Sequence, residues 1–134
     1  MKKIEHIGIA VKDLDVSNKV FASLFGQEHY KIETVESEHV KTSFFKSGPN
    51  KIELLQATDG NSPIAKFIEK RGEGIHHIAF AVEDIKKEMK RLTKEGFEFI
   101  NKTPKKGADN KLIAFLHPKS TNGVLIELCQ EIRI

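Results

Sequence analysis

The sequence predicts an α+β fold made of two copies of one module, in which a strand and a helix are followed by three more strands. The main observation is an internal repeat, because residues 6–14 (HIGIAVKDL) return as residues 77–85 (HIAFAVEDI), displaced by 71 positions. A second repeat relates residues 51–56 (KIELLQ) to residues 125–130 (LIELCQ), displaced by 74 positions. Each copy therefore begins with a strand that carries a histidine and ends with a strand that carries a glutamate.

The first copy opens with a strand and a helix. Residues 4–11 alternate in polarity and are rich in β-branched side chains, which is typical of a strand. Asp13 or Asp15 can cap the following helix, and Gly26 can end it. The apolar positions of this helix are Val16, Val20, Phe21, Leu24 and Phe25. Three strands complete the copy, at residues 30–36, 39–46 and 51–56.

The second copy follows a short linker helix. This helix is expected to begin at Ser62 and Pro63, because serine caps helices and proline suits the first helical position. Strand 75–82 opens the second copy, and Asp84 caps a helix that ends at Gly96. The residues that this helix turns inward are Ile85, Met89 and Leu92. The remaining strands are expected at residues 97–100, 111–116 and 123–129.

Neither copy has enough strands to hide both faces of its sheet, so we expect them to form one domain. The expected organisation is a single domain at residues 1–134, with module 1 at 1–58, the linker helix at 59–72 and module 2 at 73–134.

Composition excludes several classes of protein. With 39% hydrophobic and 31% charged residues in 134, the chain suits a soluble globular protein. Its apolar runs are far shorter than the roughly 18 residues of a membrane helix, and its start lacks the apolar region of a signal peptide, so we expect no membrane partner and a cytoplasmic location. The net charge of +3 is scattered, which argues against nucleic-acid binding. The single cysteine, Cys129, is expected to be a small buried side chain.

Four residues interrupt apolar strands at equivalent points of the two copies. They are His6, Glu53, His77 and Glu127. A single strand histidine or glutamate has an ordinary structural explanation, but a buried carboxylate is costly unless it is paired or binds a metal. The repeated quartet therefore favours a divalent metal such as Co²⁺, Mn²⁺, Ni²⁺, Zn²⁺ or Fe²⁺, with coordination positions left for water and substrate. Register with His6 selects His77 over its neighbour His76, which is expected to be a packing or interface residue.

The same stretches carry a family resemblance that covers essentially the whole chain. They are residues 4–11, 51–55, 62–67, 74–79, 115–119 and 123–128. The chain resembles the vicinal oxygen chelate superfamily (glyoxalase, bleomycin resistance and dioxygenase proteins), and within it the methylmalonyl-CoA epimerases. This resemblance implies two tandem βαβββ modules whose cupped mixed sheet surrounds a metal. It also implies one divalent ion per chain, with Co²⁺ favoured over Mn²⁺, Ni²⁺, Zn²⁺ or Mg²⁺. The metal ligands that it implies are His6, Glu53, His77 and Glu127.

The activity implied by the resemblance is metal-dependent epimerisation of methylmalonyl-CoA, by α-proton abstraction and reprotonation through a metal-stabilised enolate. Glu127 and Glu53 are the candidate proton-transfer groups, with Glu127 preferred. Some epimerases carry a further glutamate, a proposed base, where this chain has Thr42. The implied substrate is an acyl-CoA and the implied assembly a homodimer, for which Phe44 or Phe45 could supply apolar contacts. Candidate cations for the CoA phosphates are Lys102, Lys105, Lys106 and Lys119.

Three alternatives stay open. A glyoxalase-I-type lactoylglutathione lyase would use the same metal ligands, although only Arg71, Arg91 and Arg133 could grip glutathione carboxylates. An iron-dependent ring-cleaving dioxygenase would need fewer protein ligands on its metal. A small-molecule binding or resistance module would need no metal, which makes four retained ligands hard to explain.

Overall fold

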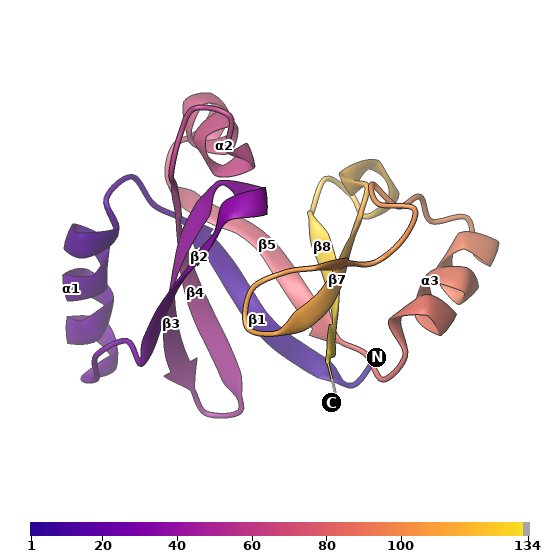
Figure 1. Cartoon of the computed structure of the whole chain (residues 1–134), viewed down its shortest axis with the longest axis horizontal. Coiled ribbons are helices and arrows are strands. Elements are labelled where there is room, and N and C mark those ends of the chain that lie inside the picture. Colours follow the sequence, from indigo (N-terminus) through magenta and orange to yellow (C-terminus); the bar gives the residue numbers. More distant parts are fainter. Residues whose placement is uncertain (133–134) are drawn as a thin grey trace. The chain divides into compact units, whose positions relative to one another are not determined.

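The computed structural model describes residues 1–132, so Arg133 lies outside the described residues (Figure 1). The fold class is α+β, as predicted. The helices are α1 (Leu14–Phe25), α2 (Pro63–Arg71) and α3 (Ile85–Lys94), with short 3₁₀ helices η1 (Glu36–Glu38) and η2 (Pro118–Ser120). The strands are β1 (Lys3–Ala10), β2 (Lys31–Val35), β3 (Val40–Ser47), β4 (Asn50–Ala57), β5 (Gly74–Ala81), β6 (Lys105–Lys106), β7 (Lys111–Leu116) and β8 (Ile126–Glu131).

The helix starts are set by the capping residues that the sequence predicted. Asp13 accepts a hydrogen bond from the backbone N–H of Val16, and Asp84 accepts the equivalent bond from Lys87. Ser62 caps α2 in the same way. Gly26 ends α1 in the left-handed conformation (φ 68°), which glycine adopts without steric cost.

A second kind of helix cap, made by a residue far away in the sequence, occurs in both modules and was not predicted. Gln56 of β4 accepts the backbone N–H of Leu14 through its side-chain oxygen at 2.6 Å. Gln130 of β8 accepts the N–H of Ile85 at 2.7 Å. Each final strand of a module therefore holds the first turn of the helix in that module, because both amides satisfy a donor that has no partner within the helix.

The expected strand at residues 97–100 is wrong, since the structure has only an isolated bridge between Phe99 and Leu116 there. Two backbone hydrogen bonds join this segment to the end of β7, from Ile100 to Phe115 and from His117 to Glu98. Side chains take two other donors: Ser120 Oγ accepts the N–H of Glu98, and Asn101 Oδ1 accepts the N–H of Phe115. The strand beside β7 is instead the two-residue β6. The last strand, β8, begins at Ile126 and not at residue 123.

The chain divides into two compact units, which are described separately. The first unit spans His6–His76, and the second comprises Met1–Glu5 and the residues from His77 onward. In the first unit the strand order is β2-β3-β4-β1, with β1 parallel to β4 and the other pairs antiparallel. Whether the two modules form the single predicted domain stays a prediction.

Helices cover both faces of the sheet in the first unit. Helix α1 covers the face of Leu54 and Phe45, where both side chains are buried against Leu14. Helix α2 covers one end of the opposite face, packing Ile64 against Leu55. The other end of that opposite face carries the histidine and glutamate of the first module.

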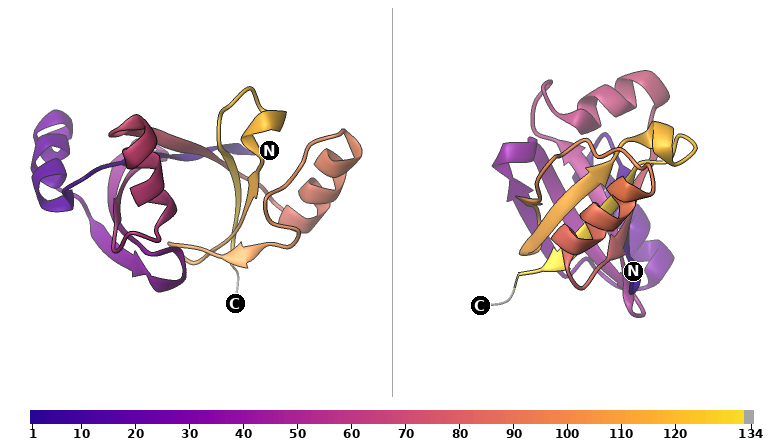
Figure 2. Two further views of the ribbon diagram at one scale, coloured as in Figure 1. Left: turned by 90° about the horizontal axis from the view of Figure 1, so that it is seen from above. Right: turned by 90° about the vertical axis from the view of Figure 1, so that its right-hand side faces the viewer.

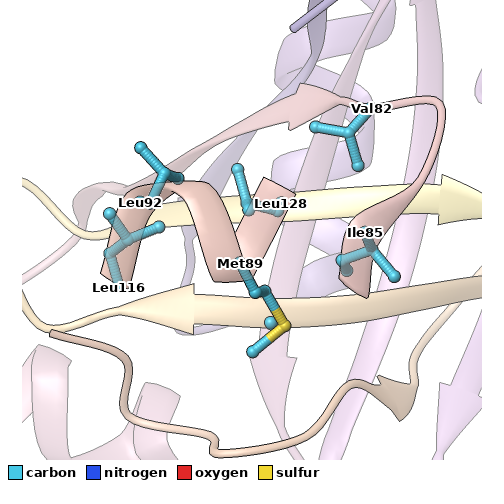
Figure 3. Packing of buried hydrophobic residues seen from close by; sticks show 7 residues of the cluster. Val82, Ile85, Met89, Leu92, Leu116 and Leu128 are labelled. Carbon is cyan, nitrogen blue, oxygen red and sulfur yellow. The ribbon is translucent and has the colours of Figure 1, made fainter. Parts of the chain in front are cut away.

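In the second unit the strand order is β5-β8-β7-β6. Helix α3 packs against β7 and β8, beside which it lies in Figure 2. Helix α3 turns Ile85, Met89 and Leu92 onto Leu116 and Leu128, as Figure 3 shows. This cluster confirms the inward residues that the sequence predicted for the helix. It also leaves the opposite face of β5, β7 and β8 clear of α3.

Only some of the apolar residues of α1 face the sheet. Val16, Val20 and Leu24 are 59%, 59% and 69% exposed, while Phe21 and Phe25 pack into the core. The helix has two apolar stripes, and only one faces the sheet. Phe44 and Phe45, expected as exposed interface residues, are buried at 0% and 1% exposure. Phe45 packs under α1, and the side chains of Tyr30 and Lys31 lie against the ring of Phe44. No helix within residues 1–132 combines the length and apolar character needed to cross a bilayer.

Candidate functional site

The first unit brings His6 and Glu53 together. Parallel pairing of β1 and β4 aligns Gly8 with Glu53, and His6 lies two residues before Gly8 on the same face. The Nδ1 atom of His6 is 3.1 Å from Oε2 of Glu53, and each residue is only 5% exposed. His6 and Glu53 meet because side chains alternate along β1, and because Gly8, which lies directly beside Glu53, has no side chain to separate them.

The second unit repeats this arrangement with His77 and Glu127. Parallel pairing of β5 and β8 aligns Ala79 with Glu127, and His77 again lies two residues earlier on the same face. Nε2 of His77 is 3.2 Å from Oε1 of Glu127, and both residues are 5% exposed. Cys129, two residues beyond Glu127, is buried as predicted.

The geometry of each pair fits two ligands of one metal ion. Nitrogen and oxygen ligands bind such ions at about 2.0–2.2 Å, so two ligands separated by 90° lie about 3 Å apart. The observed separations are 3.1 Å and 3.2 Å. In each unit, a buried imidazole and a buried carboxylate offer the ligand types that borderline divalent ions accept.

A pair of phenylalanines belongs to the same pattern and was missed from the sequence. Antiparallel pairing places Phe44 directly opposite Glu53, and Phe115 directly opposite Glu127. The ring of Phe115 meets the imidazole of His77 edge-on, with centroids 5.8 Å apart. The displacement of 71 residues that relates the histidines also relates these phenylalanines, so the repeat contained the signal.

The lysines proposed for CoA binding lie outside this pattern. Lys102, Lys105 and Lys106 are exposed, the last two in β6 at the edge of β7. Lys119 forms an ion pair with Glu98, with Nζ 2.7 Å from Oε2. The hydrogen bond from Lys119 lowers the pKa of Glu98 below its usual value. The role of these lysines in substrate binding stays a prediction.

Other histidines and charged groups have structural partners. The His76 ring packs edge-on against Phe67 at 5.0 Å, which confirms the packing role predicted for it. The backbone N–H of Asn61, and then His39, lower the pKa of Asp59. The contacts of His76 and of His39 are thus local structural ones.

The chain matches the family model of the glyoxalase/bleomycin resistance protein/dioxygenase superfamily over residues 5–115. It is 41% identical to an ethylmalonyl-CoA/methylmalonyl-CoA epimerase of Cereibacter sphaeroides, over 96% of this chain and 97% of that protein. The chain belongs to the methylmalonyl-CoA epimerase family. This family is one of isomerases within the superfamily, and the resemblance stated from the sequence is confirmed.

Solved structures of epimerases agree with this assignment. A methylmalonyl-CoA epimerase from Mycobacterium tuberculosis superposes with a TM-score of 0.93 at 33% identity, covering 98% of this chain and 89% of that one. A variant of the Streptomyces coelicolor methylmalonyl-CoA epimerase, in complex with 2-nitronate-propionyl-CoA, superposes with a TM-score of 0.94 at 32% identity. The two chains in that comparison are each covered to 99%.

Proposed function

We propose that the protein epimerises methylmalonyl-CoA at C2, the carbon between the thioester and the free carboxylate. The observation that carries this proposal is the end-to-end similarity to methylmalonyl-CoA epimerases, in a chain with two buried histidine–glutamate pairs. An α-proton flanked by a thioester and a carboxylate is weakly acidic, so its removal needs a base and stabilisation of the enolate.

The metal-binding part of the proposal assigns His6, Glu53, His77 and Glu127 to one divalent ion. It is supported by the matched pairs and by the repeat, which supplies the same two ligand types twice. Such an ion, when bound, stabilises negative charge on substrate oxygens by several kcal/mol. Co²⁺ is the ion that we favour, with Mn²⁺, Ni²⁺, Zn²⁺ or Mg²⁺ as the other candidates.

The proton-transfer part assigns Glu127 as the base that removes the α-proton, with Glu53 as the second carboxylate. Inversion at C2 needs a proton taken from one face and a proton delivered to the other. Both carboxylates are buried, so a base at either position would act on an enolate that is shielded from bulk water. Thr42 is buried on β3 where a further glutamate stands in some epimerases, so this chain depends on another second group.

Exchange in D₂O tests the activity. One epimer of methylmalonyl-CoA, incubated with metal-loaded enzyme, should become racemic and take up deuterium at C2. Ethylmalonyl-CoA in a parallel assay measures how far the acyl pocket tolerates one more methylene. Absence of exchange, together with turnover of methylglyoxal plus glutathione, would assign the lactoylglutathione lyase reaction instead.

Metal analysis separates the enzyme from a metal-free binding module. Purified protein should contain one divalent ion per chain, and a chain without stoichiometric metal would support the binding or resistance module. A homodimer, which the resemblance implies, and the cytoplasmic location expected from the sequence complete the proposal. Light scattering of the purified protein measures the assembly.

A further inference from the structure

Lys111 is a buried lysine in the second unit, on a face that already carries His77 and Glu127. The residue is only 9% exposed, in the first position of β7. A buried ammonium is costly unless acceptors satisfy its hydrogen-bond donors. The proposed chemistry at Glu127 makes no use of it.

The neighbouring carboxylate does not satisfy this lysine. Lys111 Nζ lies 3.8 Å from Oε1 of Glu131, beyond hydrogen-bond distance. The side chain of Glu131 is 72% exposed whereas that of Lys111 is 11% exposed, so the partner remains in water. A pair of this kind is weak, because solvent screens the attraction.

The internal repeat shows that the fold does not require a charge at this place. The displacement of 71 residues that relates the histidines makes Val40 the counterpart of Lys111, and the displacement of 74 makes Ala57 the counterpart of Glu131. Val40 faces Ala57 across β3 and β4 just as Lys111 faces Glu131 across β7 and β8. The apolar pair packs under α2, so the charged pair is a feature of the second module alone.

Strand alternation places the lysine on the ligand-bearing face. Lys111, Ile113 and Phe115 share one face of β7. Phe115 lies opposite Glu127 on β8 and against the ring of His77. The lysine is four residues along the strand from Phe115, about 13 Å between Cα atoms. The ammonium itself lies beside Glu131, directly across on β8, so an acyl-CoA bound at Glu127 has to extend along this face to meet it.

We infer that the Lys111 ammonium binds an anionic oxygen of the acyl-CoA substrate. This inference rests on the proposed function and adds a positioning residue to it. The anion is either the free carboxylate of the acyl group or a phosphate of CoA. An ammonium already held on the ligand face gains charge-assisted hydrogen bonds from either one.

Calorimetric binding of three thioesters to metal-loaded protein tests the inference. Lys111→Met keeps an unbranched side chain without its charge, and it should weaken binding of methylmalonyl-CoA by roughly 10- to 100-fold, with a larger effect on KM than on kcat. Loss with methylmalonyl-pantetheine but not with propionyl-CoA identifies the acyl carboxylate. Loss with propionyl-CoA but not with methylmalonyl-pantetheine identifies a CoA phosphate.

Two further variants exclude a purely structural role. Lys111→Arg should restore most of the affinity, and Glu131→Gln should bind all three thioesters like wild type. Unchanged affinity in Lys111→Met, or an equal loss in Glu131→Gln, would overturn the inference. Deuterium exchange by the wild-type enzyme is measured in parallel. If the wild type exchanges normally and Lys111→Met binds substrate as tightly as the wild type, only the role of Lys111 is refuted. If the wild type shows no exchange, the proposed function is refuted. If Lys111→Met fails to fold, Lys111→Gln replaces it.

Discussion

Glu127 and Glu131 lie on one face of β8, four residues apart, and their surroundings differ sharply. Glu127 is buried beside His77, whereas the side chain of Glu131 extends into water. The same residue type on the same strand thus occurs once as a candidate ligand and once as a surface group. This contrast provides a matched pair of variants.

Glu127→Ala should lose bound metal and lower kcat by about 10²- to 10⁴-fold, because it removes a proposed ligand and the proposed base together. Elemental analysis and the deuterium-exchange assay measure the two effects. Glu131→Ala is the control and should retain both metal and exchange. Full activity in Glu127→Ala would remove this residue from the site.

The Glu98–Lys119 pair predicts a pH-dependent effect on stability. The pKa of Glu98 is lowered from 4.5 by its hydrogen bond to Lys119. A carboxylate with a depressed folded-state pKa stabilises the protein above its unfolded pKa, and this contribution disappears as the pH falls through the folded value. Lys119→Met should therefore be slightly less stable than wild type near pH 7, and the difference should vanish in acid.

Urea unfolding of both proteins across this pH range measures that difference. The effect should be small, because the pair is exposed and screened by solvent. An equal difference at every pH would mean that Lys119 acts through packing of its methylenes and not through Glu98. The KM of the same variant reports whether Lys119 also binds CoA.

At the scale of elements, each module ties its last strand to its helix through a glutamine amide. Removing the amide of Gln130 leaves the N–H of Ile85 without its acceptor at the start of α3. Gln130→Ala should lower the free energy of unfolding by about 1–3 kcal/mol, because a buried donor is left unsatisfied.

Gln130→Glu is the matched control for this prediction. It keeps an acceptor of the same length and adds a negative charge at a helix N-terminus, where the helix dipole favours it. Chemical denaturation of both variants should rank wild type and Gln130→Glu together and Gln130→Ala below them. Equal stability of all three would show that water replaces the amide.

Most elements could be predicted from the sequence because they depend on local signals. Asp13, Ser62 and Asp84 mark helix starts by their chemistry, and the structure confirms each one. The strand at residues 97–100 could not be judged this way, since the side chain of Ser120 takes the backbone donor of Glu98, and the side chain of Asn101 takes that of Phe115 on the neighbouring strand. Which apolar stripe of α1 faces the sheet also depends on tertiary packing.

At the scale of the whole molecule, the repeat predicted the candidate ligands. Each histidine lies beside the glutamate of its own unit because strand register and alternation are conserved between the modules. Lys111 could not be found this way, because it has no charged counterpart in the first module. The burial of a lysine follows from packing, and no local pattern in the sequence reports it.

The number of ions per chain tests the joint action of the two pairs. If both pairs hold one ion, His77→Ala should abolish stoichiometric metal binding, and chelation should lower the Tm of wild type toward that of the variant. Elemental analysis and thermal unfolding with and without chelator measure this. A wild-type protein with two ions, of which His77→Ala keeps one, would show that each pair binds separately.

The strands that carry the glutamates are joined to their neighbours by connections of unequal length. Strands β3 and β4 meet in a tight hairpin in which Ser47 faces Asn50, whereas β7 and β8 are joined through η2 and further turns. Both glutamates nevertheless face a phenylalanine in the same register. The connection near the exposed Asn122 is therefore a place where residues can be inserted. A peptide inserted there should leave the register of β7 and β8 unchanged, since doubling the length of a connection costs only about 0.6 kcal/mol, and the deuterium-exchange assay checks that the variant is still active.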